Sequence, residues 1–152
     1  MSEKSQQAVE TFGHGYNCAQ SVLSVFAEDL GMNRNASLKL ASPFGAGISY
    51  MQETCGAVTG ALMAIGLKYG KGENGTDQDK MHTYNLSRQL ITEFKGRHGT
   101  LCCRQLLDGL DMSTPEGMAK IRELDLFHLR CTEFVKDAVE IAEKIIEGKA
   151  AH

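Results

Sequence analysis

The chain has 152 residues and a mass of 16.6 kDa, the size of one domain with its own hydrophobic core. Hydrophobic residues make up 42% and charged residues 23% of the chain, a composition that excludes a disordered protein. The net charge is −3 and there is no basic tract, so we expect no nucleic-acid partner.

Glycine clusters separate segments that have helical periodicity. Residues 2–12 predict a short helix. Asn17 is a suitable N-cap for a second helix that runs to Leu30, and residues 35–42 predict a third. The glycine-rich segment 44–54 has no periodicity, so we interpret it as a functional loop.

The C-terminal half continues this helical pattern. Residues 55–67 predict a helix, and a polar turn separates it from a helix over Met81–Lys95. A brief helix is expected after Thr100. Thr114 is followed by Pro115, which is typical of a further helix start.

The last helix, over residues 131–145, has the most regular apolar stripe of the chain. No segment alternates with a period of two, as a half-buried strand would. We therefore predict an all-α fold: a single compact helical bundle of about six helices that forms one domain over residues 1–152.

The location of the protein is predicted from the absence of two signals. No apolar run approaches the roughly 18 residues that cross a bilayer, so we do not expect an integral membrane protein. The N-terminal residues are polar and lack the features of an export signal, which predicts a cytoplasmic protein. Five cysteines in a reducing compartment do not fit a disulfide framework, so they call for a chemical explanation.

Three cysteines lie at predicted helix starts: Cys18, Cys55 and Cys103. Backbone N–H groups and the helix dipole lower the pKa of a thiol there, and the thiolate is the form that binds metal or attacks a disulfide. The chain has no CxxC motif, which excludes the thioredoxin signature and the usual zinc-ribbon spacing. Any cysteine site must therefore be assembled by the fold.

The cysteines lie in four segments, which are NCAQSVL, CGAVTGALMAIGLKYG, GTLCCRQLL and CTEFVKDAVEIAEKII. Together these segments resemble the C_GCAxxG_C_C family, whose members are described as redox-active. The resemblance covers nearly the whole chain, and the family's four cysteines correspond to Cys18, Cys55, Cys103 and Cys131. Cys102 departs from the pattern, and this adjacent thiol could replace Cys103 or act as a resolving partner.

The family is similar to the iron-sulfur region of split-Soret cytochrome c, which implies a helical domain that holds a cluster through cysteines. The leading hypothesis is therefore a redox protein whose four cysteines are metal ligands of an iron-sulfur cluster. A two-iron cluster is favoured, and it would pass single electrons to a redox partner protein. Gly56 and Gly60 would let the backbone approach the cluster, or would serve only helix packing. Amides of residues 45–47 could hydrogen-bond to sulfur.

Two alternatives remain open. In a cluster-free thiol-disulfide oxidoreductase, Cys18, Cys55, Cys103 and Cys131 would be the redox thiols. In a non-catalytic module, the same four residues would hold structural zinc.

Other cofactors and the assembly state are predicted from shorter patterns. The chain has no CxxCH motif for covalent haem attachment, and no dinucleotide or P-loop spacing, so we expect neither haem nor a nucleotide. The smooth face formed by Gly56 and Gly60 suggests a homodimer.

Overall fold

Local capping interactions set many helix boundaries in the computed structural model of the protein. The side chain of Asn17 accepts a hydrogen bond from the N–H of Gln20, and the side chain of Gln20 accepts one from the N–H of Asn17. This capping box satisfies N–H groups that have no partner within the first turn. Thr114 caps a later helix through the N–H of Gly117, with Pro115 at the first helical position. Both predicted helix starts are confirmed.

The structure describes residues 1–148, which form helices joined by short turns. In chain order the helical segments are α1 (Glu3–Gly13), α2 (Cys18–Ala27), η1 (Glu28–Leu30), α3 (Arg34–Ala41), η2 (Ser42–Phe44), α4 (Gly45–Ile48), α5 (Gly56–Tyr69), α6 (Asp77–His98), α7 (Cys103–Leu106), α8 (Pro115–Glu123), η3 (Phe127–Cys131) and α9 (Thr132–Ile146). The last four residues of the predicted domain lie outside the described part.

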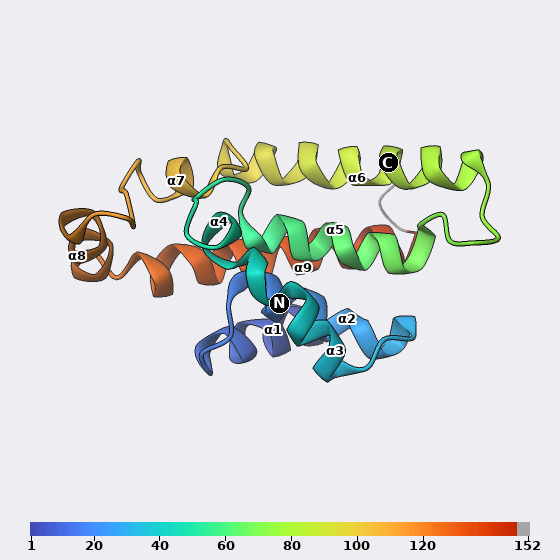
Figure 1. Ribbon diagram of the computed structural model, residues 1–152, viewed down its shortest axis with the longest axis horizontal. Coiled ribbons are helices and arrows are strands. Elements are labelled where there is room, and N and C mark those ends of the chain that lie inside the picture. The colour runs from blue at the N-terminus through green and yellow to red at the C-terminus, as the bar shows by residue number, and fades with distance from the viewer. Residues whose placement is uncertain (149–152) are drawn as a thin grey trace.

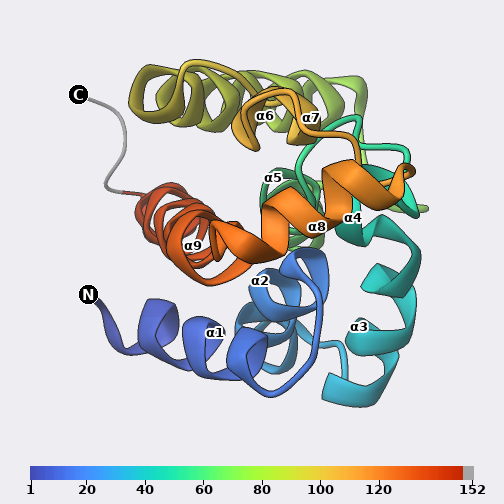
Figure 2. The same cartoon turned by 90° about the vertical axis from the view of Figure 1, so that its left-hand side faces the viewer.

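Helix α5 occupies the centre of the fold and packs against α2, α6 and α9. Figure 1 shows α6 along one side of α5, with α1, α2 and α3 on the opposite side. Seen from the end of the bundle, α9 lies between α6 and α1 (Figure 2). The short segments α4, α7 and α8 gather at one end of the bundle, beyond the start of α5.

The all-α prediction is confirmed for residues 1–148, which contain no strand. About six helices is too low a count, because short helical turns such as η2 and α4 occur in connecting segments without hydrophobic periodicity. The helix expected from Met81 begins at Asp77, since Thr76 and Asp79 form a capping box. Its first turn is exposed and polar, so the apolar pattern did not reveal it. No helix in the described part is both long and apolar enough to span a membrane.

The smooth face of α5 lies against α2 of the same chain. A Cβ atom at Gly60 would lie 2.7 Å from the carbonyl oxygen of Ala19, and one at Gly56 would lie 3.1 Å from the nitrogen of Ala19. Glycine therefore allows the two helix backbones to approach closely at both positions. Because α2 covers this face, it gives no support to a homodimer, which stays a prediction.

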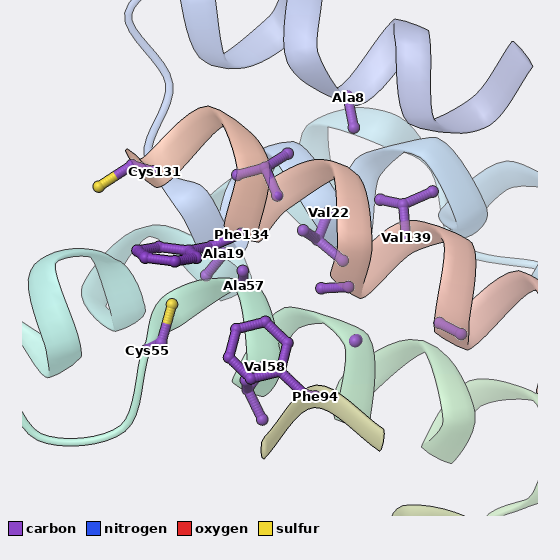
Figure 3. Close-up of a cluster of buried hydrophobic side chains, with 14 of the residues drawn as sticks. Ala8, Ala19, Val22, Cys55, Ala57, Val58, Phe94, Cys131, Phe134 and Val139 are labelled. Carbon is purple, nitrogen blue, oxygen red and sulfur yellow. The ribbon is translucent and has the colours of Figure 1, made fainter. Parts of the chain in front are cut away.

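One hydrophobic cluster runs through the bundle from α1 to α9. Phe94 of α6 and Phe134 of α9 pack edge to face within it, with 6.2 Å between ring centres. Figure 3 shows Cys55 and Cys131 at one end of this core, on either side of the Phe134 ring. The core thus ends at two of the predicted site residues.

Candidate four-cysteine site

The four cysteines that the sequence singled out line one cavity. Cys18, Cys55, Cys103 and Cys131 all border a space of about 170 Å³ at the end of the core. The rest of its wall is mainly apolar and includes the rings of Phe12, Tyr50, Phe127 and Phe134. The fold therefore brings together thiols from four separate segments of the chain.

Helix starts position three of these cysteines, as predicted. Cys18 is the first residue of α2, Cys55 is the N-cap residue of α5, and Cys103 is the first residue of α7. Cys131 lies where the π-helical turn η3 joins α9. Such π-helical turns are often found at functional sites.

A short antiparallel pairing explains why Cys103 faces the cavity and Cys102 does not line it. The N–H of Cys55 donates to the carbonyl of Leu101 at 2.8 Å, and the N–H of Cys103 donates to the carbonyl of Glu53 at 2.6 Å. Cys102 lies between these two hydrogen bonds, in an isolated β-bridge. Successive side chains of an extended segment point to opposite faces. Cys55 and Cys103 therefore share the cavity side, and Cys102 points away from it.

One wall of the cavity is a left-handed turn formed by residues 46–50. Its φ angles are all positive, between 49° at Ser49 and 70° at Ile48. A non-glycine residue in this conformation costs about 1–2 kcal/mol, so surrounding contacts must hold it. One such contact is the hydrogen bond from the N–H of Gln52 to the carbonyl of Ala46, at 3.1 Å. The sequence predicted an irregular loop here but not its handedness.

Two glycines keep space free beside the cysteines. A Cβ atom at Gly47 would lie 2.7 Å from Cβ of Cys103, and one at Gly56 would lie 3.2 Å from Cβ of Cys18. Both glycines border the cavity, whereas Gly60 does not. Of the two glycines expected to approach a cofactor, Gly56 lies at the site and Gly60 serves helix packing.

An ion pair holds two cysteine-bearing segments together. Arg130 donates two hydrogen bonds to the carboxylate of Asp108, at 3.0 and 2.9 Å, and one to the carbonyl of Leu106 at 3.2 Å. Such a bidentate pair also fixes geometry. Leu106 ends the helix that begins at Cys103, and Arg130 precedes Cys131. The pair therefore links the segments of these two thiols.

Cys18, Cys55 and Cys103 are weaker acids than ordinary thiols. Burial raises the pKa of Cys103 to about 12, and burial also raises the pKa of Cys55 well above the ordinary value of 9.0. The pKa of Cys18 is raised first by a hydrogen bond with the Cys131 thiol and then by burial. We expected helix starts to lower these pKa values. Backbone N–H groups do lower the pKa of Cys55, but the loss of hydration outweighs them.

These raised pKa values predict that the reduced, cluster-free protein loses stability at alkaline pH. An unfolded thiol ionises near 9.0, whereas folded Cys103 keeps its proton up to a pKa of about 12. The stabilising effect is therefore complete below about pH 9 and is lost as the pH rises toward 12. We expect the urea midpoint to fall over this range. Replacing Cys55 and Cys103 by alanine should make the fall shallower, and an equally steep fall would contradict the prediction.

The four cavity thiols match the donor set of a sulfur-ligated cluster. Within residues 1–148, no three His, Cys, Asp or Glu side chains are placed to hold one metal ion. Tetrahedral zinc needs four donors converging on one point, with sulfur at about 2.3 Å. The four thiols instead surround a cavity, and four cysteine thiolates are the usual ligand set of two-iron and four-iron clusters. The residues present therefore fit a cluster by donor type and number.

Gln52 is a buried polar residue beside the site that the sequence analysis missed. It is 2% exposed. Its backbone carbonyl accepts hydrogen bonds from Sγ of Cys102 at 3.3 Å and from the N–H of Arg104 at 3.2 Å. Its side chain lowers the pKa of Cys103, against the larger effect of burial. Glutamine is ordinarily exposed, so no local signal marked this position.

Comparisons with known proteins agree with the cysteine pattern. A protein-family model described as "Putative redox-active protein (C_GCAxxG_C_C)" matches residues 16–145. An "Uncharacterized protein" of Archaeoglobus fulgidus is 29% identical in an alignment of 148 residues that covers 92% of this chain and 91% of that protein. No solved structure matches the chain. Because the matched region contains all four cavity cysteines and most of the chain, the protein belongs to the C_GCAxxG_C_C family.

Proposed function

We propose that the protein is a one-electron carrier whose four cavity cysteines hold an iron-sulfur cluster of the two-iron type. The observation that supports this proposal is the placement of Cys18, Cys55, Cys103 and Cys131 around one cavity. A bound cluster supplies a centre that gains and loses single electrons. One redox protein would donate the electron and another would accept it, and no covalent bond of the chain would change.

The chain's own groups would favour negatively charged sulfur at this site. The N–H groups of Ala57 and Val58, at the start of α5, lower the pKa of Cys55. Arg104 acts in the same direction on Cys103. These donors and charges offset part of the cost of burying thiolates. Gly47 and Gly56 leave the space that an inorganic cluster would need.

The cavity lies close enough to the surface for electron exchange with a partner protein. Tyr50 lines the cavity and is 63% exposed, and Ile48 of the same left-handed turn is 40% exposed. Cys18 is itself only partly buried. A partner that docks over this turn would approach the site without any rearrangement of the core.

Metal and sulfide analysis of cysteine variants tests the proposal. We expect wild-type protein, purified without oxygen or reconstituted with iron and sulfide, to absorb visible light and to contain equal amounts of iron and acid-labile sulfide. Cys55→Ala should lose the absorbance and the iron because it removes one ligand. Cys102→Ala is the matched control, since Cys102 does not line the cavity, and it should retain both. Two irons per chain would support the two-iron type.

Three results would overturn the cluster assignment. They are failure of the wild-type protein to take up iron and sulfide, full iron retention in Cys55→Ala, and stoichiometric zinc without iron. The last result would favour the structural zinc module. Circular dichroism should show unchanged helix content in both variants, so that a loss of iron reports a lost ligand rather than unfolding.

The contact between Cys18 and Cys131 favours a second candidate function. Both thiols line the same cavity, and Cys131 is the largest influence that raises the pKa of Cys18, so they are neighbours in the fold. In a thiol-disulfide oxidoreductase they would give two electrons and two protons to a disulfide substrate, which becomes two thiols as a Cys18–Cys131 disulfide forms. If this function is correct, mild oxidation of the metal-free protein removes two thiols, and peptide mapping finds this bond.

A further inference from the structure

Gln52 has an unusual position for a polar residue. It is 2% exposed and has a φ angle of +54°, just after the left-handed turn of residues 46–50. A buried side-chain amide is retained only when hydrogen bonds replace its lost hydration. The partners of this amide therefore indicate what the residue does.

Two backbone groups fix the orientation of the Gln52 amide. Its Nε2 donates to the carbonyl of Leu110 at 2.9 Å, and its Oε1 accepts from the N–H of Met112 at 2.7 Å. A carbonyl can only accept and an N–H can only donate, so rotating the amide by 180° would lose both hydrogen bonds. The amide nitrogen therefore has one remaining hydrogen, with a fixed direction.

The same residue is in contact with the segment that carries Cys103. A Cβ atom placed on Gly47 would lie 2.5 Å from Cα of Gln52 and 2.7 Å from Cβ of Cys103, so these residues meet without an intervening side chain. The backbone carbonyl of Gln52 accepts one hydrogen bond from Sγ of Cys102 and one from the N–H of Arg104, the residues on either side of Cys103. Gln52 thus holds the backbone around one cavity thiol.

We propose that Gln52 is a positioning residue of the four-cysteine site, which fixes the segment of Cys103 and donates its remaining amide hydrogen to Sγ of Cys103. Within the proposed function, this hydrogen bond stabilises the more negative, reduced state of a bound cluster. It therefore raises the reduction potential.

Two substitutions remove the donor in different ways. Gln52→Met keeps the length of the side chain without polar atoms. Gln52→Glu keeps the shape and the acceptor for the N–H of Met112, so it provides a second variant if Gln52→Met does not fold. Gln78→Met is the matched control, because it makes the same change at an exposed glutamine of α6 that does not line the cavity.

The first measurement is the reduction potential of the reconstituted proteins. We expect a lower potential in both Gln52 variants and an unchanged potential in Gln78→Met. The second measurement needs no cluster. It is the rate at which iodoacetamide alkylates Cys103 in the reduced, metal-free protein at pH 8. Mass spectrometry of the peptide that contains Cys103 measures this rate. We expect a several-fold slower reaction in the Gln52 variants, since loss of a donor disfavours the thiolate.

The two measurements separate the possible failures. Faster alkylation of Cys103 in both Gln52 variants would show only a loosened structure and would overturn the proposal, as would an unchanged rate. If no variant and no wild-type sample takes up a cluster, but alkylation slows as expected, the role of Gln52 stands and the cluster function fails. If clusters form and the potential does not shift, the hydrogen bond to Cys103 is rejected.

Discussion

Phe94→Ala is expected to lower the free energy of unfolding by about 3–5 kcal/mol, the range for removing a buried aromatic ring. Phe94 is fully buried on α6 and packs against Phe134 at 6.2 Å and against His98 at 4.7 Å between ring centres. The alanine would leave a cavity that the well-packed neighbours fill only in part. Because Phe134 also lines the cysteine cavity, the loss should loosen that wall. Urea denaturation of the reduced protein measures the change.

Tyr84 provides a control on the same helix. It is 49% exposed, and Tyr84→Ala should change the free energy of unfolding by less than about 0.5–1 kcal/mol. The prediction is wrong if the two alanine variants unfold at similar urea concentrations. Such a result would mean that α6 does not pack on the core as the structure has it.

Gly60→Ala is expected to destabilise the protein by about 1–3 kcal/mol, as overpacking does in a filled interior. The added Cβ would lie 2.7 Å from the carbonyl oxygen of Ala19 and 3.2 Å from Cβ of Val22. Since backbone atoms cannot move aside as a side chain can, α2 must shift away from α5. That shift would also separate Cys18 from Cys55, so the proposed cluster function predicts weaker iron retention in the variant. Urea denaturation and iron analysis measure the two effects.

Gly66 is the matched control in the same helix. A Cβ atom there meets nothing within 4 Å, so Gly66→Ala should stabilise the protein by up to about 1 kcal/mol through helix propensity. Equal destabilisation by the two substitutions would refute the close approach of α2 and α5. Equal stabilisation by the two substitutions would also refute this close approach.

Helix positions were predictable where local interactions determine them. Asn17 and Gln20 cap α2 through groups three residues apart, and Thr114 with Pro115 starts α8 by the same short-range chemistry. Hydrophobic periodicity likewise predicted α5 and α9. The start of α6 at Asp77 was missed because the prediction relied on apolar periodicity, which its polar first turn lacks, although Thr76 and Asp79 form a local cap of the same kind.

The geometry of the site depends on contacts between distant segments. The choice of Cys103 over Cys102 follows from hydrogen bonds between residues 53–55 and 101–103, almost 50 residues apart. The left-handed turn includes the β-branched Ile48, which would not adopt a φ angle of 70° without support from tertiary contacts. Neither the choice of Cys103 nor the handedness of the turn can be predicted from the residues of the segment in which it occurs.

The sequence by itself determined that the protein is all-α, where most helices begin, and which four cysteines have the family's pattern. Caps and hydrophobic periodicity act over three or four residues, so they can be read directly from the chain. Only the tertiary structure decided that the four thiols share one cavity, that burial makes Cys55 and Cys103 weak acids, and that Gln52 lies beside Cys103. The hydration of a side chain and its contacts depend on which distant segments pack around it. A pattern of neighbouring residues in the sequence does not show which segments these are.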